Sequence, residues 1–487
     1  MNNEVGLVTS IKDFLIHING LPTVKVNDLV ESENGARGWV NALFSDQVEI
    51  LMLTENSVSI GQMFKRSGKR LTITVGEFLL GRATNPLGEP IDGSRLLAKT
   101  KTDAEYRINN PAPGIDKREF IRDQFDTGIA IVDSLIPLGK GQRELILADA
   151  RSGKDDFLVD LIINQKSAGV ICIYAMIGKP VAQIRTIIDT LGLNKALEYT
   201  AIIATSSTDP APLIYLTPYA AITIAEHFQK QGKDVLVIFD DLGNHAKVYR
   251  EISLLGNKFP GRESYPGDMF FQHANLLERA GKFKPEFGGG SITALPVIEL
   301  NTGDFTNYIP TNLMSMTDGH LMFKSGFYNQ GQRPAIDISL SVSRVGRQTF
   351  NHLQLELIRR VKKMLTQSAQ LETVSRFATE LPKETRLILK QKQAVMELVN
   401  QESLTRLSKQ EQLVILSLVF TSFMDDQYIK LLKNIFVLDR KKVLLKAFTQ
   451  NPELSSLVEA AFQFKNYDEL LLKLESIIPK LEKIWQI

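Results

Sequence analysis

One short segment constrains the fold more than any other part of the sequence: an apolar strand that runs through a loop into a helix. The apolar run covers residues 144–147, the loop carries Gly153 and Lys154, and helical spacing follows from Phe157. This order is the context of a phosphate-binding Walker A loop. In such a loop, backbone N–H groups and the helix dipole favour an anion, while the lysine reaches the terminal phosphates. The segment therefore predicts an α/β domain of the P-loop type.

Two positions of this loop depart from the Walker A pattern. Ala148 stands where the pattern has its first glycine, and Asp155 stands where it has the Ser or Thr that places a hydroxyl on magnesium. Two like charges at about 4 Å repel by roughly 4 kcal/mol at an effective dielectric constant of about 20, so the Asp155 carboxylate opposes bound phosphates. Two interpretations remain open: a weakened nucleotide site, and a loop that keeps the shape of a phosphate cradle without binding nucleotide tightly. The candidate residues are Ala148, Asp149, Ala150, Arg151, Ser152, Gly153, Lys154 and Asp155.

A second motif lies about 85 residues further along the chain. Residues 235–239 form an apolar run that ends in the paired carboxylates Asp240 and Asp241. A buried strand that ends in acids is typical of a Walker B strand, in which the first acid holds magnesium through water. Asp240 is therefore the candidate metal residue. The alternative is an aspartate that only caps a strand end or begins a helix.

Three regions of different pattern divide the chain. Residues 1–70 carry short β-rich runs separated by turn signals such as Asn19-Gly20, which predicts a β-barrel domain, with an irregular sheet as the alternative. Residues 71–350 alternate buried apolar strands with helical stretches, which predicts an α/β domain with a mostly parallel sheet. In residues 351–487, Pro and Gly become scarce and apolar residues recur at helical spacing, which predicts an all-α helical domain.

Composition excludes several classes of protein. Lys plus Arg number 57 and Asp plus Glu number 55, so the chain lacks the basic excess typical of nucleic-acid binding. Its single cysteine, Cys172, allows no internal disulfide, which favours a reducing compartment. No apolar run approaches the ~20 residues that span a bilayer, and the N-terminus has no secretory pattern. We therefore expect a cytoplasmic chain that neither inserts into a membrane nor binds nucleic acid.

Six sequence marks in one order give the chain a resemblance to a known family. It resembles the α subunit of F-type ATP synthases, the nucleotide-binding but non-catalytic partner of the β subunit. This resemblance implies a barrel, a RecA-like P-loop domain at residues 71–350 whose Walker A loop is degenerate, and a helical C-terminal domain. The marks are Ala112-Pro113-Gly114-Ile115, Thr127-Gly128-Ile129 with Val132-Asp133-Ser134, Gly141-Gln142-Arg143-Glu144, Pro260-Gly261-Arg262-Glu263 with Tyr265-Pro266-Gly267-Asp268, Gly288-Gly289-Gly290-Ser291 with Thr293-Ala294-Leu295-Pro296, and Ser341-Val342-Ser343-Arg344-Val345-Gly346.

The resemblance assigns roles to several residues. Arg344 matches the family's arginine finger, which would act in trans at the catalytic site of a β-like subunit; the alternative is an arginine in a salt bridge at a strand end. Arg333 and Pro334 match the family's adenine-contact pair. Gln401 matches one of two adenine-side glutamines, and Ser403 stands at the second.

Two further departures separate the chain from its catalytic relatives. After the strand 172–176, catalytic β subunits place a glutamate that orients the attacking water, and here Lys179 occupies that place. An ammonium group cannot act as a base at neutral pH, so we expect no ATP hydrolysis in the chain's own site. The sequence also starts almost directly on the barrel at Val5, whereas the family it resembles has an N-terminal helical extension that docks the peripheral-stalk δ subunit. From this resemblance we expect no contact with a δ subunit.

These observations lead to one hypothesis and three alternatives. The hypothesis is a non-catalytic α-like subunit of an F-type-like rotary ATPase hexamer, with a β-like catalytic subunit and a γ-like central shaft as partners. Mg-ATP or Mg-ADP would bind at the interface with the β-like subunit, and hydrolysis would drive mechanical work, as in the specialised ATPases of wall-less bacteria. Such a complex could lie at the inner face of the cell membrane. The alternatives are the α subunit of a conventional proton-translocating synthase, a self-sufficient RecA-like hexamer, and a non-enzymatic ring scaffold.

Overall fold

The computed structural model describes residues 4–54, 57–93, 103–300, 304–375, 382–422 and 451–485. Internal contacts divide the chain into two compact units, each of which is built from segments that are not contiguous in sequence. Unit 1 comprises Met1–Ile121, Lys140–Arg151 and Gln165–Lys324, and unit 2 comprises Arg122–Gly139, Ser152–Asn164 and Ser325–Ile487.

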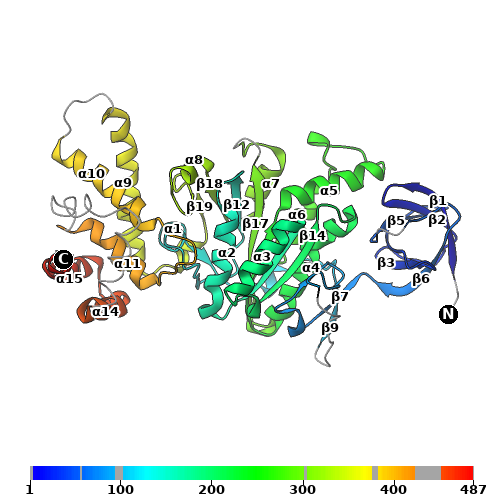
Figure 1. Ribbon diagram of the computed structural model, residues 1–487, viewed down its shortest axis with the longest axis horizontal. Helices are drawn as coiled ribbons and strands as arrows, with labels where there is room; N and C mark the ends of the chain where they lie inside the picture. The colour runs from blue at the N-terminus through cyan, green and yellow to red at the C-terminus, as the bar shows by residue number, and fades with distance from the viewer. Residues whose placement is uncertain are drawn as a thin grey trace. The chain divides into compact units, whose positions relative to one another are not determined.

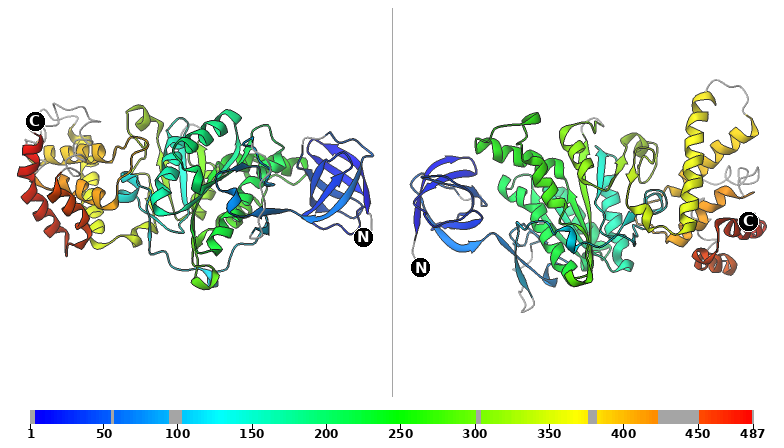
Figure 2. Two further views of the ribbon diagram at one scale, coloured as in Figure 1. Left: turned by 60° about the horizontal axis from the view of Figure 1, so that its bottom comes forward. Right: turned by 180° about the vertical axis from the view of Figure 1, so that it is seen from behind.

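Unit 1 begins with a closed six-stranded antiparallel barrel, drawn in blue in Figure 1 and seen end-on in the rear view of Figure 2. Alternate residues of its strands point inward, and side chains such as Val30, Val40 and Ile50 form a fully buried core. Around the barrel the strands run in the order β1 (Val5–Lys12), β2 (Leu15–Asn19), β5 (Val48–Met52), β4 (Arg37–Leu43), β3 (Asp28–Ser32) and β6 (Met63–Arg70). Closure pairs β6 with β1, so the barrel has no open edge.

The rest of unit 1 is built on a parallel sheet. Its strands are near-continuous apolar runs, because helices cover both faces of sheets of this kind. The strands run in the order β18 (Gly319–Phe323), β12 (Glu144–Asp149), β17 (Ser291–Leu300), β15 (Asp234–Asp240), β13 (Ile171–Lys179), β14 (Thr200–Ser206) and β8 (Ala83–Thr84), and each of these pairings is parallel. The helices of this unit are α3 (Val181–Leu193), α4 (Ala211–Lys230), α5 (Leu242–Leu255), α6 (Met269–Leu277) and α7 (Tyr308–Met316). A two-stranded ribbon, β7 (Thr72–Val75) with β9 (Ala104–Arg107), completes it.

One interior strand, β17, was not predicted from the sequence pattern. It contains Pro296, which stands in register with Phe239 of β15. A proline has no backbone N–H to give to a ladder and ordinarily argues against an interior strand. Burial explains why the segment is nevertheless extended, because nine of the ten side chains of β17 are buried.

Unit 2 is mainly helical. Two of its long helices, α9 (His352–Ser375) and α10 (Lys383–Val399), lie side by side, as the yellow ribbons of Figures 1 and 2 show. A reciprocal capping box between Ser408 and Glu411 fixes the start of α11. The helices of the unit are α1 (Ala130–Leu135), α2 (Lys154–Asn164), α8 (Ser325–Asn329), α9 (His352–Ser375), α10 (Lys383–Val399), α11 (Lys409–Ser417), α14 (Pro452–Glu459) and α15 (Tyr467–Trp485), and its short strands are β10 (Gln124–Phe125), β11 (Leu138–Gly139) and β19 (Val342–Ser343).

The predicted fold class is confirmed: the chain has an N-terminal barrel, a central α/β domain and a C-terminal helical region. The domain bounds at residues 70 and 350 stay a prediction. Among the helices of the described ranges, none combines the length and the apolar character that crossing a bilayer requires.

Candidate functional site

The predicted phosphate loop joins the end of β12 at Asp149 to the start of α2 at Lys154. Arg151 and Gly153 in this loop both have positive φ, 58° and 76°. A Cβ atom at Gly153 would lie 2.3 Å from the ring of Tyr328, so both the backbone angle and the packing require glycine there. The sharp turn expected of a P-loop is therefore present, although Ala148 replaces its first glycine.

The side chains of this loop pair with each other. Lys154 is 6% exposed, and its Nζ lies 2.6 Å from Oδ1 of Asp155. Ser152 is buried, and its Oγ has no hydrogen-bond partner in the described part of the chain. The carboxylate that the sequence predicts to repel phosphate thus also neutralises the lysine that would attract it.

Asp240 ends β15 and is completely buried. Its Oδ1 lies 2.7 Å from Nζ of Lys179, and its Oδ2 accepts a hydrogen bond of 3.1 Å from the hydroxyl of Tyr174. Both carboxylate oxygens, which would hold a water-ligated magnesium ion in a Walker B strand, therefore have partners from the same protein. The neighbouring Asp241 caps α5 and accepts from the backbone N–H of Asn244, a contact that fits the capping alternative.

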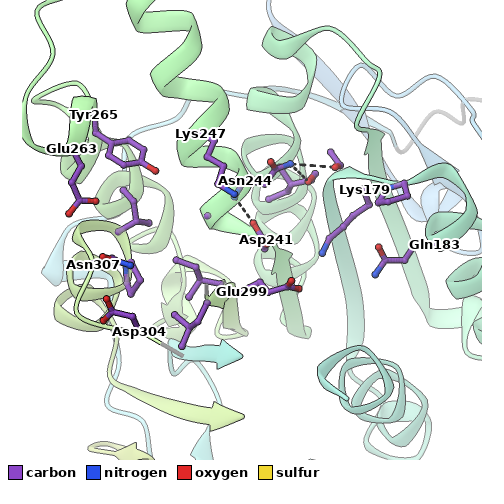
Figure 3. A pocket seen from close by; sticks show the side chains of 18 residues that line it. Lys179, Gln183, Asp241, Asn244, Lys247, Glu263, Tyr265, Glu299, Asp304 and Asn307 are labelled. Atoms are coloured by element: carbon purple, nitrogen blue, oxygen red, sulfur yellow. Dashed lines mark hydrogen bonds between the residues drawn. The ribbon is translucent and has the colours of Figure 1, made fainter. Parts of the chain in front are cut away.

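A cavity of about 480 Å³ opens in unit 1 where β13, β15 and β17 end. Carboxyl ends of parallel strands are the usual place for a ligand in α/β sheets. Figure 3 shows Lys179 extending into this cavity and Glu299 facing it. The other charged lining residues are Asp241, Lys247, Glu263 and Asp304. Within the described ranges, no three His, Cys, Asp or Glu residues are grouped as metal ligands.

Unit 2 contains a smaller cavity of about 260 Å³ that brings together Arg333, Pro334 and Gln401, the three predicted adenine-side residues. The guanidinium of Arg333 lies over the ring of Tyr328, 3.4 Å from its centroid, and donates to the carbonyl oxygen of Tyr328. Stacked in this way, the Arg333 side chain forms a wall of the cavity.

The side-chain amide of Gln401 is occupied by backbone groups. Its Nε2 donates to the carbonyl oxygens of Gly128 and Thr405, and its Oε1 accepts from the N–H of Ala130. Both donors are used, so the residue holds the loop 128–130 and has only a lone pair left for a ligand. The role predicted for Gln401 therefore comes with a structural one that sequence matching does not reveal.

Ser403, which stands at the second glutamine position, donates from its Oγ to Asp160 on α2 at 2.7 Å. The N–H of Leu404 donates to the same carboxylate oxygen. Burial raises the pKa of Asp160, although these two hydrogen bonds oppose the rise. The serine thus ties the wall of the cavity to α2.

Arg344 is exposed, and its side chain makes no hydrogen bond or ion pair with any residue that the structure describes. The residues around it are fixed. Ser343 donates from its Oγ to the carbonyl oxygen of Pro137 at 2.6 Å and accepts from the N–H of Gly346. A Cβ at Gly346 would lie 1.6 Å from that same carbonyl oxygen. Among the residues described, the motif therefore presents an arginine without an ion-pair partner, on a turn held by these contacts, which does not fit the salt-bridge alternative.

Sequence reasoning did not find the pairing of Lys179 with Asp240. The signal was available, because both residues follow apolar runs that become the adjacent parallel strands β13 and β15. Met176 stands in register with Asp240, and β13 continues for three residues to Lys179. Only the strand order, a long-range property, shows that the two residues meet.

Comparison with known proteins places these features in context. Residues 128–343 match the model of the ATP synthase alpha/beta family, nucleotide-binding domain. The chain is 41% identical over 424 residues to ATP synthase subunit alpha of Caldanaerobacter subterraneus subsp. tengcongensis, an alignment that covers 87% of this chain and 83% of the relative. It is 40% identical over 424 residues to ATP synthase subunit alpha of Streptococcus pyogenes serotype M5, with coverages of 87% and 84%.

Proposed function

The chain belongs to the ATP synthase alpha/beta family, and we propose that it is the non-catalytic, alpha-like subunit of a rotary ATPase hexamer. In this role it alternates with a β-like catalytic subunit around a γ-like shaft. Mg-ATP or Mg-ADP is then the substrate held in the partner's site. The relatives are named ATP synthase subunit alpha, and the alignments cover 83% and 84% of their length, which supports this assignment.

The observation that carries the proposal is the state of Arg344. An arginine finger must reach a phosphate held by another subunit, so its side chain has to be exposed and uncommitted before the complex forms. Arg344 meets both conditions within the described residues, and Ser343 and Gly346 hold its turn on Pro137. A finger supplied in trans stabilises charge on the transferred phosphoryl group and contributes about 10³–10⁵ in rate.

The chain's own loop supports the non-catalytic part of the proposal. Lys179 stands where a catalytic relative has its water-orienting acid, and its ammonium is already paired with Asp240. Lys154, the candidate phosphate lysine, is paired with Asp155. In these two ion pairs, Lys179 offers no base for the attacking water, and the charge of Lys154 is already balanced by a carboxylate.

Hydrolysis for mechanical work, as opposed to synthesis, is a separate part of the proposal and rests on the resemblance alone. One transition state serves both directions, so the geometry of Arg344 is equally compatible with either. Coupling distinguishes them: ATP turnover by the complex on sealed membrane vesicles should be insensitive to a proton gradient across the vesicle membrane. A rate that responds to the gradient would instead favour the conventional synthase.

The experiment that tests the assignment compares ATP turnover by this chain, by its β-like partner and by their reconstituted complex. We expect no turnover by the chain alone and full turnover only by the complex. When the Arg344→Ala chain is mixed with the β-like partner, we expect the complex to assemble, as measured by size-exclusion chromatography, but not to hydrolyse ATP. Hydrolysis by the chain alone would favour a self-sufficient hexamer, and full turnover with the Arg344→Ala chain would favour a pure scaffold.

A further inference from the structure

We infer that the ammonium group of Lys179 stands in the place of a divalent cation at Asp240, so that this chain has no magnesium position at its Walker B strand. The inference deepens the proposed non-catalytic role and rests on it. It reverses the sequence-based expectation that Asp240 holds magnesium through water, and it concerns residues of unit 1 alone.

The first argument is the occupancy of the Asp240 carboxylate. Lys179 Nζ lies 2.7 Å from Oδ1, and the Tyr174 hydroxyl lies 3.1 Å from Oδ2. Magnesium requires near-octahedral oxygen ligands and retains several of its waters. A hydrated ion next to this carboxylate would need the space that the ammonium and the phenol hydroxyl fill. The residues present therefore do not fit the ion.

The second argument is charge and burial. Asp240 is completely buried and the Lys179 side chain is 11% exposed. A buried carboxylate needs a paired cation, and Lys179 already supplies one charge. A divalent cation added at the same carboxylate would face the ammonium at close range. Three positive charges, two on the metal ion and one on the ammonium, would then share the single negative charge of Asp240, with little water to screen them.

The third argument is the backbone that aims Lys179. The register of β13 against β14 shifts between Met176 and Lys179, and Gly178 in this bulge has a φ of 61°. A Cβ at Gly178 would lie 2.5 Å from Nδ2 of Asn244. Asn244 in turn donates from Nδ2 to the carbonyl oxygen of Ile177. Bulges commonly redirect a side chain, and this one directs Lys179 toward the end of β15.

The experiment titrates the full-length wild-type chain with Mn²⁺, a paramagnetic substitute for magnesium, and follows bound metal by electron paramagnetic resonance. We expect no stoichiometric site on the wild type at millimolar Mn²⁺. Lys179→Gln should gain one site, with affinity at least tenfold higher than that of the wild type, and Lys179→Gln with Asp240→Asn should lose it. Lys247→Gln is the matched control, because Lys247 lines the same cavity and should leave the titration unchanged.

Two results would overturn the inference: one Mn²⁺ per wild-type chain that disappears in Asp240→Asn, or a folded Lys179→Gln chain that gains no site. Lys179→Met keeps the length of the aliphatic stem and replaces the glutamine variant if that one does not fold. If neither variant folds, the titrations of the wild type and of Asp240→Asn decide. One Mn²⁺ per wild-type chain that Asp240→Asn does not bind would contradict the inference. Because this titration needs no partner subunit and does not involve Arg344, its failure is distinguishable from failure of the proposed function.

Discussion

At the scale of single residues, Asp155 is the departure from the Walker A pattern that places a negative charge in the loop between β12 and α2. It holds Lys154 at 2.6 Å, and its own carboxylate would face any phosphate that the lysine attracted. The side chain of Asp155 is 42% exposed, so water screens much of this repulsion and the full low-dielectric interaction does not apply.

Replacing Asp155 with Thr should therefore strengthen ATP binding to the isolated chain. The change removes the ion pair of Lys154 with Asp155 and one negative charge, and we expect a gain in affinity of about 5- to 30-fold, or ~1–2 kcal/mol. Equilibrium dialysis with labelled ATP measures it. Glu384→Gln is the matched control, since Glu384 also lies in the first turn of a helix, α10, but does not line the cavity of Arg333 and Gln401. An unchanged affinity in Asp155→Thr would show that this carboxylate is not what weakens the site.

Residue patterns predicted the site unevenly. Asp240 could be identified from sequence because it ends an apolar run, and Lys179 could be identified through the resemblance to catalytic β subunits. Their contact could not, since it depends on β13 and β15 being neighbours. The backbone bonds of the Gln401 side chain were equally hidden, because its partners Gly128 and Ala130 lie about 270 residues earlier in the chain.

At the scale of elements, the turn from Ser343 to Gly346 determines where Arg344 points. Gly346 packs so closely on the carbonyl oxygen of Pro137 that a methyl group would force the turn away.

We expect Gly346→Ala to lower ATP turnover of the reconstituted complex at least tenfold, because a finger displaced by about 1 Å loses its alignment with the transition state. The chain should still fold and assemble, so the loss of turnover should not be explained by a loss of folded protein in a thermal unfolding measurement. Gly326→Ala serves as the control, since a Cβ at Gly326 meets no atom within 4 Å. Full turnover by a folded Gly346→Ala complex would argue against precise positioning of Arg344.

Two buried histidines connect α5 and α6 in unit 1. His245 Nδ1 lies 3.2 Å from His273 Nε2, and both rings are almost completely buried. Burial lowers the pKa of His245 to about 4, and burial together with the His245 charge lowers the pKa of His273 well below its ordinary value.

This pair predicts that the chain loses stability in mild acid. The folded-state pKa of His245 lies below the ordinary value of 6.5, so its stabilising effect is complete above pH 6.5 and is lost as the pH falls from 6.5 toward 4. The loss from His245 alone is roughly 3 kcal/mol, since each pKa unit corresponds to about 1.4 kcal/mol. Thermal unfolding between pH 4 and 8 measures it. A His245→Gln chain should show a shallower decline below pH 6.5, and identical profiles would contradict the assignment.

At the scale of the whole molecule, pattern alone predicted the three kinds of architecture, because barrel strands, buried parallel strands and amphipathic helices differ in period. The strand order of the sheet was out of reach, and β17 in particular was obscured by Pro296. The division into two units that draw on separated stretches of sequence was equally inaccessible, since it depends on contacts and not on local pattern.

The central claim is that this chain completes a catalytic site that it does not itself contain. The most direct measurement is kcat for ATP hydrolysis by the reconstituted complex carrying Arg344→Ala, beside a complex carrying Arg347→Ala. Arg347 is also exposed and lies three residues further on, so it controls for loss of surface charge. We predict that kcat falls about 10³-fold or more with Arg344→Ala, with little change in KM, and stays near wild type with Arg347→Ala. Wild-type kcat in an assembled Arg344→Ala complex would contradict the claim.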